Sequence, residues 1–496
     1  MSGLPSFEHT YADAVPELST PWRAAEVDEP KLLLLNENLA GELGLDVDRL
    51  RSPEGVAMLA GQVPEGTRTY AQAYAGHQFG SYSPVLGDGR ALLLGELVDP
   101  AGLRHDLHLK GSGRTPFARG GDGYAAVGPM VREYLMGEAM HALGIPTTRA
   151  LAVVATGRTI MRERPLPGAV LARVASSHLR VGTFAYTANL GRPDVLRSLA
   201  DYTIERHHPA LREADSPYLA LFDAVMRAQA ELVAQWMGVG FVHGVMNTDN
   251  TTISGETIDY GPCAFLDAHD PRAVFSSIDH SGRYAYGNQP GIIQWNLARL
   301  GEALLPLIAD VPAGDAAPVH QASIDAAVEA ATGVLDAYAG HYEQAVMRVM
   351  SAKFGLGDGV GDQESREVVT SGLALLAKES PDHTGFFRGL IDGTARGLVD
   401  DPAEFDQWAE RRSALVGDES SEQARSAQQM ASVNPVYIPR NHVVEEALTA
   451  ATGGDLAPVE RLVAALRRPF EEQPGMEHLA RPAPSDAAPH VTYCGT

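Results

Sequence analysis

The pattern of apolar and polar positions divides the chain into a strand-rich part and a helical part. Between residues 61 and 175, short apolar runs are separated by glycine-rich turns, which predicts strands at 91–98, 103–110, 151–154 and 169–172. One helix is expected among them. It should begin at Pro129, because proline is favoured in the first helical turn, and stop at Gly144.

Beyond about residue 190 the apolar residues recur at helical spacing. Ser216 and Pro217 are suited to open a long helix, and Gly238 is expected to end it. The same spacing predicts two further helices at 292–308 and 322–350.

Four segments are expected along the chain. They are an irregular N-terminal arm with one short helix at 1–60, a β-rich N-terminal lobe at 61–175, a mainly helical C-terminal lobe at 176–410 and a C-terminal extension at 411–496. In the extension, the polar stretch 411–432 predicts a linker or an exposed helix, and the proline-rich last 25 residues predict an extended tail. The result is an α+β, two-lobed architecture with a ligand cleft between the lobes.

Charge and composition exclude several classes of protein. The net charge is −24, and a field of that sign repels phosphate backbones, so we expect no nucleic-acid partner. No apolar run reaches the roughly 18 residues that a membrane span needs. The two cysteines, Cys263 and Cys494, are too few for a disulfide framework, and the N-terminus lacks a signal-peptide pattern, so a cytoplasmic protein is expected.

The segment after the long helix carries the first candidate chemistry. Residues 243–250 (His-Gly-Val-Met-Asn-Thr-Asp-Asn) and 259–261 (Asp-Tyr-Gly) follow the order of the H-R-D-L-x-x-x-N and D-F-G motifs of protein kinases. Asn250 and Asp259 would supply oxygen ligands suited to Mg²⁺. Val245 occupies the position of the kinase base, and a carboxylate reappears only at Asp249. Either the chain transfers no phosphoryl group, or another residue acts in a shifted geometry; a polar turn between strands is the ordinary alternative.

A second constellation lies upstream. Lys110 is one of only four lysines, and it precedes a segment, 111–123, with five glycines and two arginines. Glycines let backbone N–H groups approach phosphate, and arginines donate to it in pairs. Glu133, on the helix predicted after Pro129, could pair with Lys110 as in kinases. The ordinary alternatives are a hairpin turn at 87–90 (Gly-Asp-Gly-Arg) and a surface ion pair worth about 0–1 kcal/mol.

Two arginines form a third element. Arg173 and Arg180 are seven residues apart, which would place them on one face if the segment were helical. There they could neutralise the terminal phosphates of a nucleotide. A solvated basic face is the alternative.

These motifs together resemble the selenoprotein O, or YdiU-type, family of pseudokinases over nearly the whole length. The most specific blocks are 74–80 (Tyr-Ala-Gly-His-Gln-Phe-Gly), 86–90 (Leu-Gly-Asp-Gly-Arg), 110–116 (Lys-Gly-Ser-Gly-Arg-Thr-Pro), 132–134 (Arg-Glu-Tyr), 243–250, 259–263 (Asp-Tyr-Gly-Pro-Cys) and 434–441 (Asn-Pro-Val-Tyr-Ile-Pro-Arg-Asn). The resemblance implies a protein-kinase-like fold with N- and C-terminal extensions. It also implies transfer of AMP from ATP, bound in a reversed orientation, to Ser, Thr or Tyr hydroxyls of proteins, itself included, with release of pyrophosphate.

The resemblance also assigns roles to residues. Lys110 and Glu133 would form the ion pair, Asn250 and Asp259 would hold Mg²⁺ or Mn²⁺, and Asp249 would be the base or the carboxylate that orients the acceptor. The residues implied to contact the nucleotide are Gly87, Gly89, Arg90, Lys110, Asp122, Gly123, Arg173, Arg180 and Asp259. In a reversed nucleotide the cations would surround the leaving pyrophosphate, where stabilisation of developing charge acts best.

The two cysteines gain a role by the same resemblance. A Cys263–Cys494 disulfide would tie the tail to the segment after Asp259 and set activity by redox state. Family members often end in a cysteine or selenocysteine followed by two serines, whereas Cys494 is followed by Gly495 and Thr496. Two rival functions stay open: a kinase that transfers the γ-phosphate, and a non-catalytic, nucleotide-binding scaffold.

Overall fold

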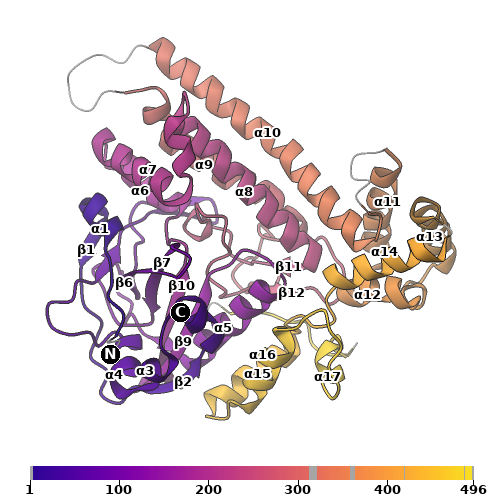
Figure 1. Ribbon diagram of the computed structural model, residues 1–496, viewed down its shortest axis with the longest axis horizontal. Helices are drawn as coiled ribbons and strands as arrows, with labels where there is room; N and C mark the ends of the chain where they lie inside the picture. The colour runs from indigo at the N-terminus through magenta and orange to yellow at the C-terminus, as the bar shows by residue number, and fades with distance from the viewer. Residues whose placement is uncertain (1–3, 312–320, 358–362, 418, 485, 494–496) are drawn as a thin grey trace.

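A single antiparallel sheet organises the first part of the chain in the computed structural model, which describes residues 4–311, 321–357, 363–417, 419–484 and 486–493. Figure 1 shows the sheet beside a group of long helices. Its strands, in spatial order, are β1 (Ser19–Pro21), β3 (Tyr70–Gln72), β6 (Ala91–Val98), β7 (Arg104–Lys110), β10 (Pro165–Ala175), β9 (Arg149–Met161) and β2 (Lys31–Leu35), and β8 (Ala125–Ala126) pairs with β10. The four predicted strands are therefore confirmed, and the last two are longer than expected.

Both faces of the sheet are buried, and side-chain alternation along β10 demonstrates this. Val170, Ala172 and Val174 pack with the short helices α2 (Glu37–Glu42), α3 (Val47–Arg51) and α4 (Pro53–Leu59), whereas Ala169 and Leu171 pack with α5 (Val127–Ala142). Successive side chains of a strand point to opposite faces, so one strand contributes to two cores.

The first 60 residues are more ordered than the predicted arm with one short helix. They contain α1 (Thr10–Ala14) and α2–α4, and they contribute strands β1 and β2 to the sheet. The prediction was wrong because each of these elements is too short to show a period of its own, and they are stabilised by burial against the sheet. The division of the chain into four domains stays a prediction.

Helix α5 confirms the helix predicted at 129–143, although it begins two residues earlier. It is buried on nearly every side, because the sheet covers one face while α15 (Asn441–Thr452) and α16 (Ala457–Leu466) cover another. A helix enclosed in this way has little freedom to shift.

Three long helices form the centre of the second part: α8 (Pro217–Val239), α9 (Gln289–Ile308) and α10 (Gln321–Lys353). All three were predicted. Helix α8 ends at Gly240, which adopts the left-handed conformation with φ of 71°, and not at Gly238. Gly238 is needed for a different reason: a Cβ there would lie 2.6 Å from Cγ1 of Val349 on α10.

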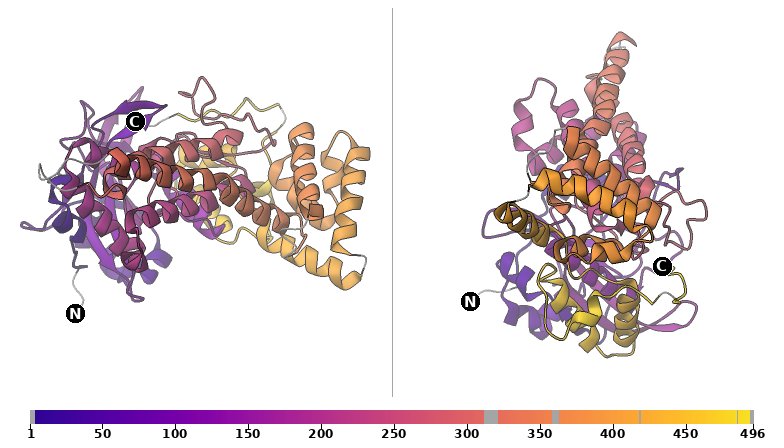
Figure 2. Two further views of the ribbon diagram at one scale, coloured as in Figure 1. Left: turned by 90° about the horizontal axis from the view of Figure 1, so that it is seen from above. Right: turned by 90° about the vertical axis from the view of Figure 1, so that its right-hand side faces the viewer.

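The remaining helices surround this centre, and Figure 2 shows α11–α14 at one end of the molecule. They are α6 (Val181–Asn189), α7 (Pro193–His207), α11 (Gln363–Glu379), α12 (His383–Asp392), α13 (Pro402–Val416), α14 (Ser420–Val433) and α17 (Glu477–Ala480). Residues 411–432 thus fall mainly within α13 and α14, as the exposed-helix alternative predicted. Within the described residues, no helix is long and apolar enough to cross a membrane.

Lys353, at the end of α10, is buried and has no acidic partner among the residues that the structure describes. Its side chain is 3% exposed, its Nζ donates to Oδ1 of Asn434 at 2.7 Å, and it lies 4.2 Å from the centroid of the Phe387 ring. Burial of the ammonium lowers its pKa to about 7. The charged form is therefore unfavourable in the folded protein.

The free energy of unfolding should consequently rise with pH. Between pH 7 and 9 the unfolded chain binds a proton at Lys353 that the folded chain releases, so stability increases as pH rises through the folded pKa. We expect a gain of about 2 kcal/mol over this window relative to Lys353→Met, measured by urea unfolding at several pH values. Lys31→Met, at an exposed lysine, should leave the pH dependence of the wild type intact. Parallel curves for the wild type and Lys353→Met would contradict the burial of the charge.

Candidate functional site

The predicted site residues line two adjoining cavities of about 300 and 560 Å³. The two cavities have one wall in common, which is formed by Gln78, Arg90, Lys110, Asp249 and Asp259. The smaller cavity adds Gly87, Gly89, Asp122, Gly123, Arg173 and Arg180, and the larger one adds Glu133 and Asn250. Every residue predicted to contact the nucleotide or a metal ion therefore lies in one cleft.

Lys110 is the centre of the cleft. At the end of β7 its Nζ lies 2.6 Å from Oε2 of Glu133 on α5 and 2.6 Å from Oδ1 of Asp259. Burial alone would raise the pKa of both carboxyls, but the positive charge of Lys110 outweighs it and holds each pKa below its usual range. The Lys110 side chain is only 9% exposed, so the surface ion pair considered for Lys110 and Glu133 is excluded.

Asp259 is also held in an unusual backbone conformation. Its φ is 67°, in the left-handed region that residues with a side chain rarely adopt. The next residue, Tyr260, is buried and hydrogen-bonded to the hydroxyl of Thr147. The surrounding contacts thus fix Asp259 in a strained position with its carboxylate directed at Lys110.

Arg173 reaches the same cluster from β10. Its Nη1 donates to Oε1 of Glu133 at 3.0 Å, and its Nε donates to Nε2 of His178 at 3.2 Å. Arg180 is the N-cap residue of α6. The segment between the two arginines is therefore not helical, and the predicted shared helix face was wrong. Both arginines nevertheless line the smaller cavity, because the end of β10 and the start of α6 lie against it.

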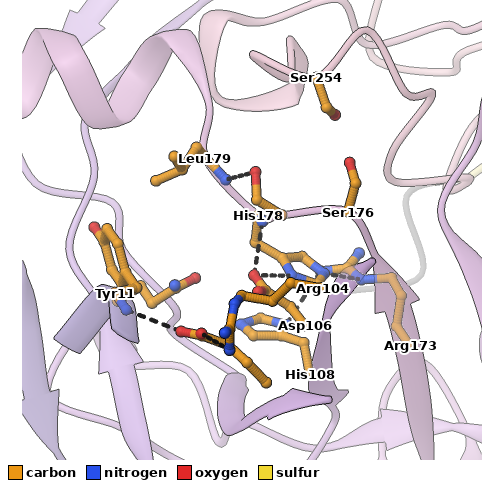
Figure 3. Close-up of polar contacts among 12 residues, drawn as sticks. Tyr11, Arg104, Asp106, His108, Arg173, Ser176, His178, Leu179 and Ser254 are labelled. Carbon is orange, nitrogen blue, oxygen red and sulfur yellow. Dashed lines mark hydrogen bonds and ion pairs between the residues drawn. The ribbon is translucent and has the colours of Figure 1, made fainter. Parts of the chain in front are cut away.

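Two stacked histidines lie behind Arg173 and hold it from the side away from the cleft. The rings of His108 and His178 are parallel with centroids 4.2 Å apart, and Figure 3 shows His178 between Asp106 and Arg173. Burial lowers the pKa of both histidines, so both are neutral at pH 7. Because arginine only donates and a carboxylate only accepts, Nδ1–H of His178 donates to Asp106 while Nε2 accepts from Arg173. His108 uses the opposite tautomer.

His108, in the opposite tautomer, links Arg173 to the turn formed by residues 87–90. Its Nε2–H donates to Oδ2 of Asp88 at 2.9 Å, and its Nδ1 accepts from Nη2 of Arg173 at 3.3 Å. Asp88 belongs to the turn that carries Gly87 and Gly89, and it is fully buried. The turn and the arginine are therefore positioned by one hydrogen-bonded network. Sequence reasoning did not assign these histidines a role, since no local pattern marks them.

Asp249 lies in the wall common to both cavities. Burial raises the pKa of its carboxyl to about 6 although the charge of Arg180 opposes the shift. Nη1 of Arg180 donates to the backbone oxygen of Asp249 at 2.9 Å, and the guanidinium lies over the ring of Tyr74, 4.4 Å from its centroid. Oδ1 of Asp249 has no hydrogen-bond partner among the described residues. This oxygen has almost no solvent-exposed surface, because it lies against Gly76.

The hairpin of β4 (Gly76–Gln78) and β5 (Ser81–Ser83) packs against Asp249. A Cβ on Gly76 would collide with Oδ1 of Asp249, so only glycine fits there. The backbone N–H groups of His77 and Phe79 donate to Thr248 and Asn247, at 2.7 and 3.2 Å. These residues belong to block 74–80, whose unusual run of small, aromatic and amide residues was the available signal, although no role followed from it.

Oxygen donors in the larger cavity suit a hard divalent cation. Nδ2 of Asn250 donates to the carbonyl of Val245 at 3.0 Å, which directs its Oδ1 to the opposite side, and Asp249 and Asp259 contribute carboxylate oxygens. No group of three His, Cys, Asp or Glu side chains in the described ranges could hold a metal ion unaided. The residues therefore fit Mg²⁺ or Mn²⁺ only with further ligands, such as phosphate oxygens.

Cys263 is fully buried four residues after Asp259, and burial raises the pKa of its thiol to about 11. Its carbonyl oxygen accepts from Nη2 of Arg132 at 2.5 Å. Cys494 lies outside the described residues, so the predicted Cys263–Cys494 disulfide stays a prediction.

The cleft combines a buried lysine joined to two carboxylates with arginines and glycine turns, which is the set of groups that a nucleotide-dependent transferase requires. Comparison with known proteins agrees: a family model described as "Protein adenylyltransferase SelO" matches residues 5–467. The chain belongs to this family.

Several curated relatives cover nearly the whole chain, and each is named "Protein nucleotidyltransferase YdiU". The protein of Mycolicibacterium smegmatis is 57% identical over 491 residues, which are 98% of this chain and 97% of the relative. The protein of Pseudarthrobacter chlorophenolicus is 55% identical over 493 residues, with the same coverage. The protein of Cereibacter sphaeroides strain ATCC 17025 is 53% identical over 499 residues, 99% of each chain. The family assignment made from sequence is confirmed.

His178 offers a test of the network behind the cleft, because it supports Arg173 without lining either cavity. His178→Asn keeps a group near Nδ1 but removes the acceptor for Arg173, and we expect KM for ATP to rise about tenfold. His178→Gln places an oxygen near the lost Nε2 and should recover much of the affinity. The matched control is His207→Asn, at a neighbouring histidine that bonds Ser177 instead. Equal KM values for all variants would contradict the positioning role.

Proposed function

We propose that the chain transfers AMP from ATP to Ser, Thr or Tyr hydroxyls of proteins, including its own, and releases pyrophosphate. Its family consists of protein adenylyltransferases, so ATP is the substrate and proteins are the acceptors. The main support for transfer to a hydroxyl group is the position of Asp249 in the wall between the two cavities. A nucleotide in the arginine-lined cavity and an acceptor hydroxyl in the larger one would meet at this carboxylate.

The reaction uses the groups on each side of that wall. The acceptor oxygen attacks the α-phosphorus, the bond from this phosphorus to the β-bridging oxygen breaks, and Asp249 accepts the hydroxyl proton. Lys110, Arg173 and Arg180 stabilise the negative charge that develops on the departing pyrophosphate. Mg²⁺ or Mn²⁺ held by Asn250 and Asp259 would neutralise phosphate charge when bound.

A protein-kinase-like, two-lobed arrangement is part of the proposal. The order Lys110, Glu133, Asn250, Asp259 along the chain and the buried ion pair between the first two support it. The apolar Val245 lines the larger cavity at the position of the kinase base and can accept no proton. Transfer from a reversed nucleotide accounts for this loss, because the reacting phosphorus would face Asp249 instead.

Redox control and a cytoplasmic location complete the proposal. Two cysteines in the whole chain suit a reducing compartment, where a disulfide is regulatory when it forms. Peptide mapping of the oxidised protein by mass spectrometry should find residues 263 and 494 linked, and the reduced protein should yield both as free thiols. Two free thiols in the oxidised sample would remove the disulfide from the proposal.

Transfer of label from ATP tests the reaction itself. The reduced protein with Mg²⁺ should incorporate label from the α-phosphate and none from the γ-phosphate, counted on the protein after self-modification. Asp259→Asn should lower this incorporation at least about 100-fold, because the metal ligand and the partner of Lys110 are both lost. Asp406→Asn, at an exposed carboxylate paired with Arg396, is the control and should retain full incorporation.

The two rival functions predict different outcomes. Label from the γ-phosphate alone would identify a kinase. Binding of nucleotide with no incorporation from either position, on itself or on added proteins, would identify a scaffold.

A further inference from the structure

Residues 481–484 and 486–493, called the tail below, end next to the cleft, where Thr492 forms one β-bridge. The backbone N–H of Thr492 donates to the carbonyl of Phe275 at 2.8 Å, and the N–H of Ser277 donates to the carbonyl of Thr492 at 2.9 Å. These bonds form a parallel bridge between Ser276 and Thr492. Figure 2 shows that the tail runs from α17 back to the side of the strands. Segment 275–277 therefore hydrogen-bonds an extended polypeptide through its backbone, while the ring of Phe275 lies beside that of His490, with centroids 6.0 Å apart.

Side-chain burial in the tail alternates as it does in a strand. Thr492 is 4% exposed, and its Oγ1 donates to the carbonyl of Pro262 at 2.7 Å. Its neighbours Val491 and Tyr493 are 44% and 73% exposed. One enclosed position thus holds a small hydroxyl side chain, while the positions on either side are largely open to solvent.

This strand lies in the wall of the catalytic cleft. Residues 491–493 line the larger cavity together with Asp249, Asn250 and Asp259. Ile278, which directly follows segment 275–277, lines the same cavity. Ile278 is 46% exposed, which leaves an apolar surface beside the tail. The tail thus occupies the side of the cavity that an acceptor protein must reach.

We propose that segment 275–277 is the docking strand for an extended segment of the acceptor protein, and that the tail occupies it as a competing internal ligand. This inference rests on the proposed transfer to proteins and adds how the acceptor is held. Main-chain hydrogen bonds supply affinity that is independent of sequence, and the enclosed position favours Ser or Thr. The tail competes strongly because it is part of the same molecule, at a high effective concentration.

Peptide binding tests the docking strand without any catalysis. The probe is a fluorescein-labelled peptide with the sequence of residues 487–493 (Ala-Ala-Pro-His-Val-Thr-Tyr), which stops before Cys494, so no disulfide contributes. The receptor is the full-length, reduced Thr492→Pro protein, whose own tail lacks the backbone donor. We expect fluorescence anisotropy to show binding at least about tenfold tighter to this variant than to the wild type.

A change in the peptide provides the matched control. The same peptide N-methylated at the threonine keeps every side chain but lacks the N–H that Phe275 accepts, and it should bind at least about tenfold more weakly. This comparison holds even if Thr492→Pro alters the fold locally, because the protein is the same in both measurements. Equal affinity of the two peptides, or of the wild type and Thr492→Pro for the unmodified peptide, would overturn the proposal.

Kinetic measurements separate binding of the acceptor at the docking strand from the transfer reaction. With α-labelled ATP and dephosphorylated casein as the acceptor, Thr492→Pro should lower KM for casein severalfold and leave KM for ATP unchanged. An unchanged KM for casein would overturn competition by the tail. If neither protein transfers label from the α-phosphate, the proposed function fails, and the peptide measurement decides the docking strand by itself.

Discussion

The buried contact of Lys110 with two carboxylates is the constraint on which the rest of the site depends. It joins three elements that are far apart in sequence: β7, α5 through Glu133, and the segment that begins at Asp259. A buried ammonium without acidic partners is costly, as the lowered pKa of Lys353 illustrates, and a buried carboxylate without a cation is equally costly. Each element is therefore held by the charge that the others supply, and the cleft has one favourable arrangement.

The C-terminal part of the structure stabilises that arrangement from outside. Asn441 binds the backbone of Phe265 through both its amide oxygen and its amide nitrogen, and Arg440 forms ion pairs with Asp267 and Asp382. Arg132, next to Glu133, binds the carbonyl of Cys263. Residues 434–441 thus bind the part of the chain that follows Asp259, and α15 packs against α5. Helix α5 is covered both by the sheet and by α15 and α16, so the ion pair of Lys110 and Glu133 is built into the fold.

Sequence reasoning located the residues that line the cleft more reliably than the packing around them. Lys110, Glu133, Asn250 and Asp259 could be located, because Lys110 ends an expected strand, Glu133 lies on the helix predicted after it, and Asn250 and Asp259 follow the order of known motifs. The spacing of Arg173 and Arg180 predicted a shared face only if the segment were helical, and that condition is not met, because a strand ends and a helix begins there. His108, His178 and Gly76 could not be assigned, because each has a partner that lies 65 to 173 residues away in sequence: Arg173 for His108, Asp106 for His178 and Asp249 for Gly76.

The two sides of the cleft use different interactions: cations line the smaller cavity, whereas backbone and hydroxyl groups bind the tail. The chain as a whole carries −24, yet Arg90, Lys110, Arg173 and Arg180 all line the smaller cavity. A polyphosphate is attracted there only at short range, where buried cations act with little screening. The acceptor side offers instead two backbone hydrogen bonds, one enclosed hydroxyl position and an apolar residue, none of which requires a particular charge. An enzyme built in this way is selective for its nucleotide through electrostatics, while its choice of protein is limited mainly to segments that can become extended.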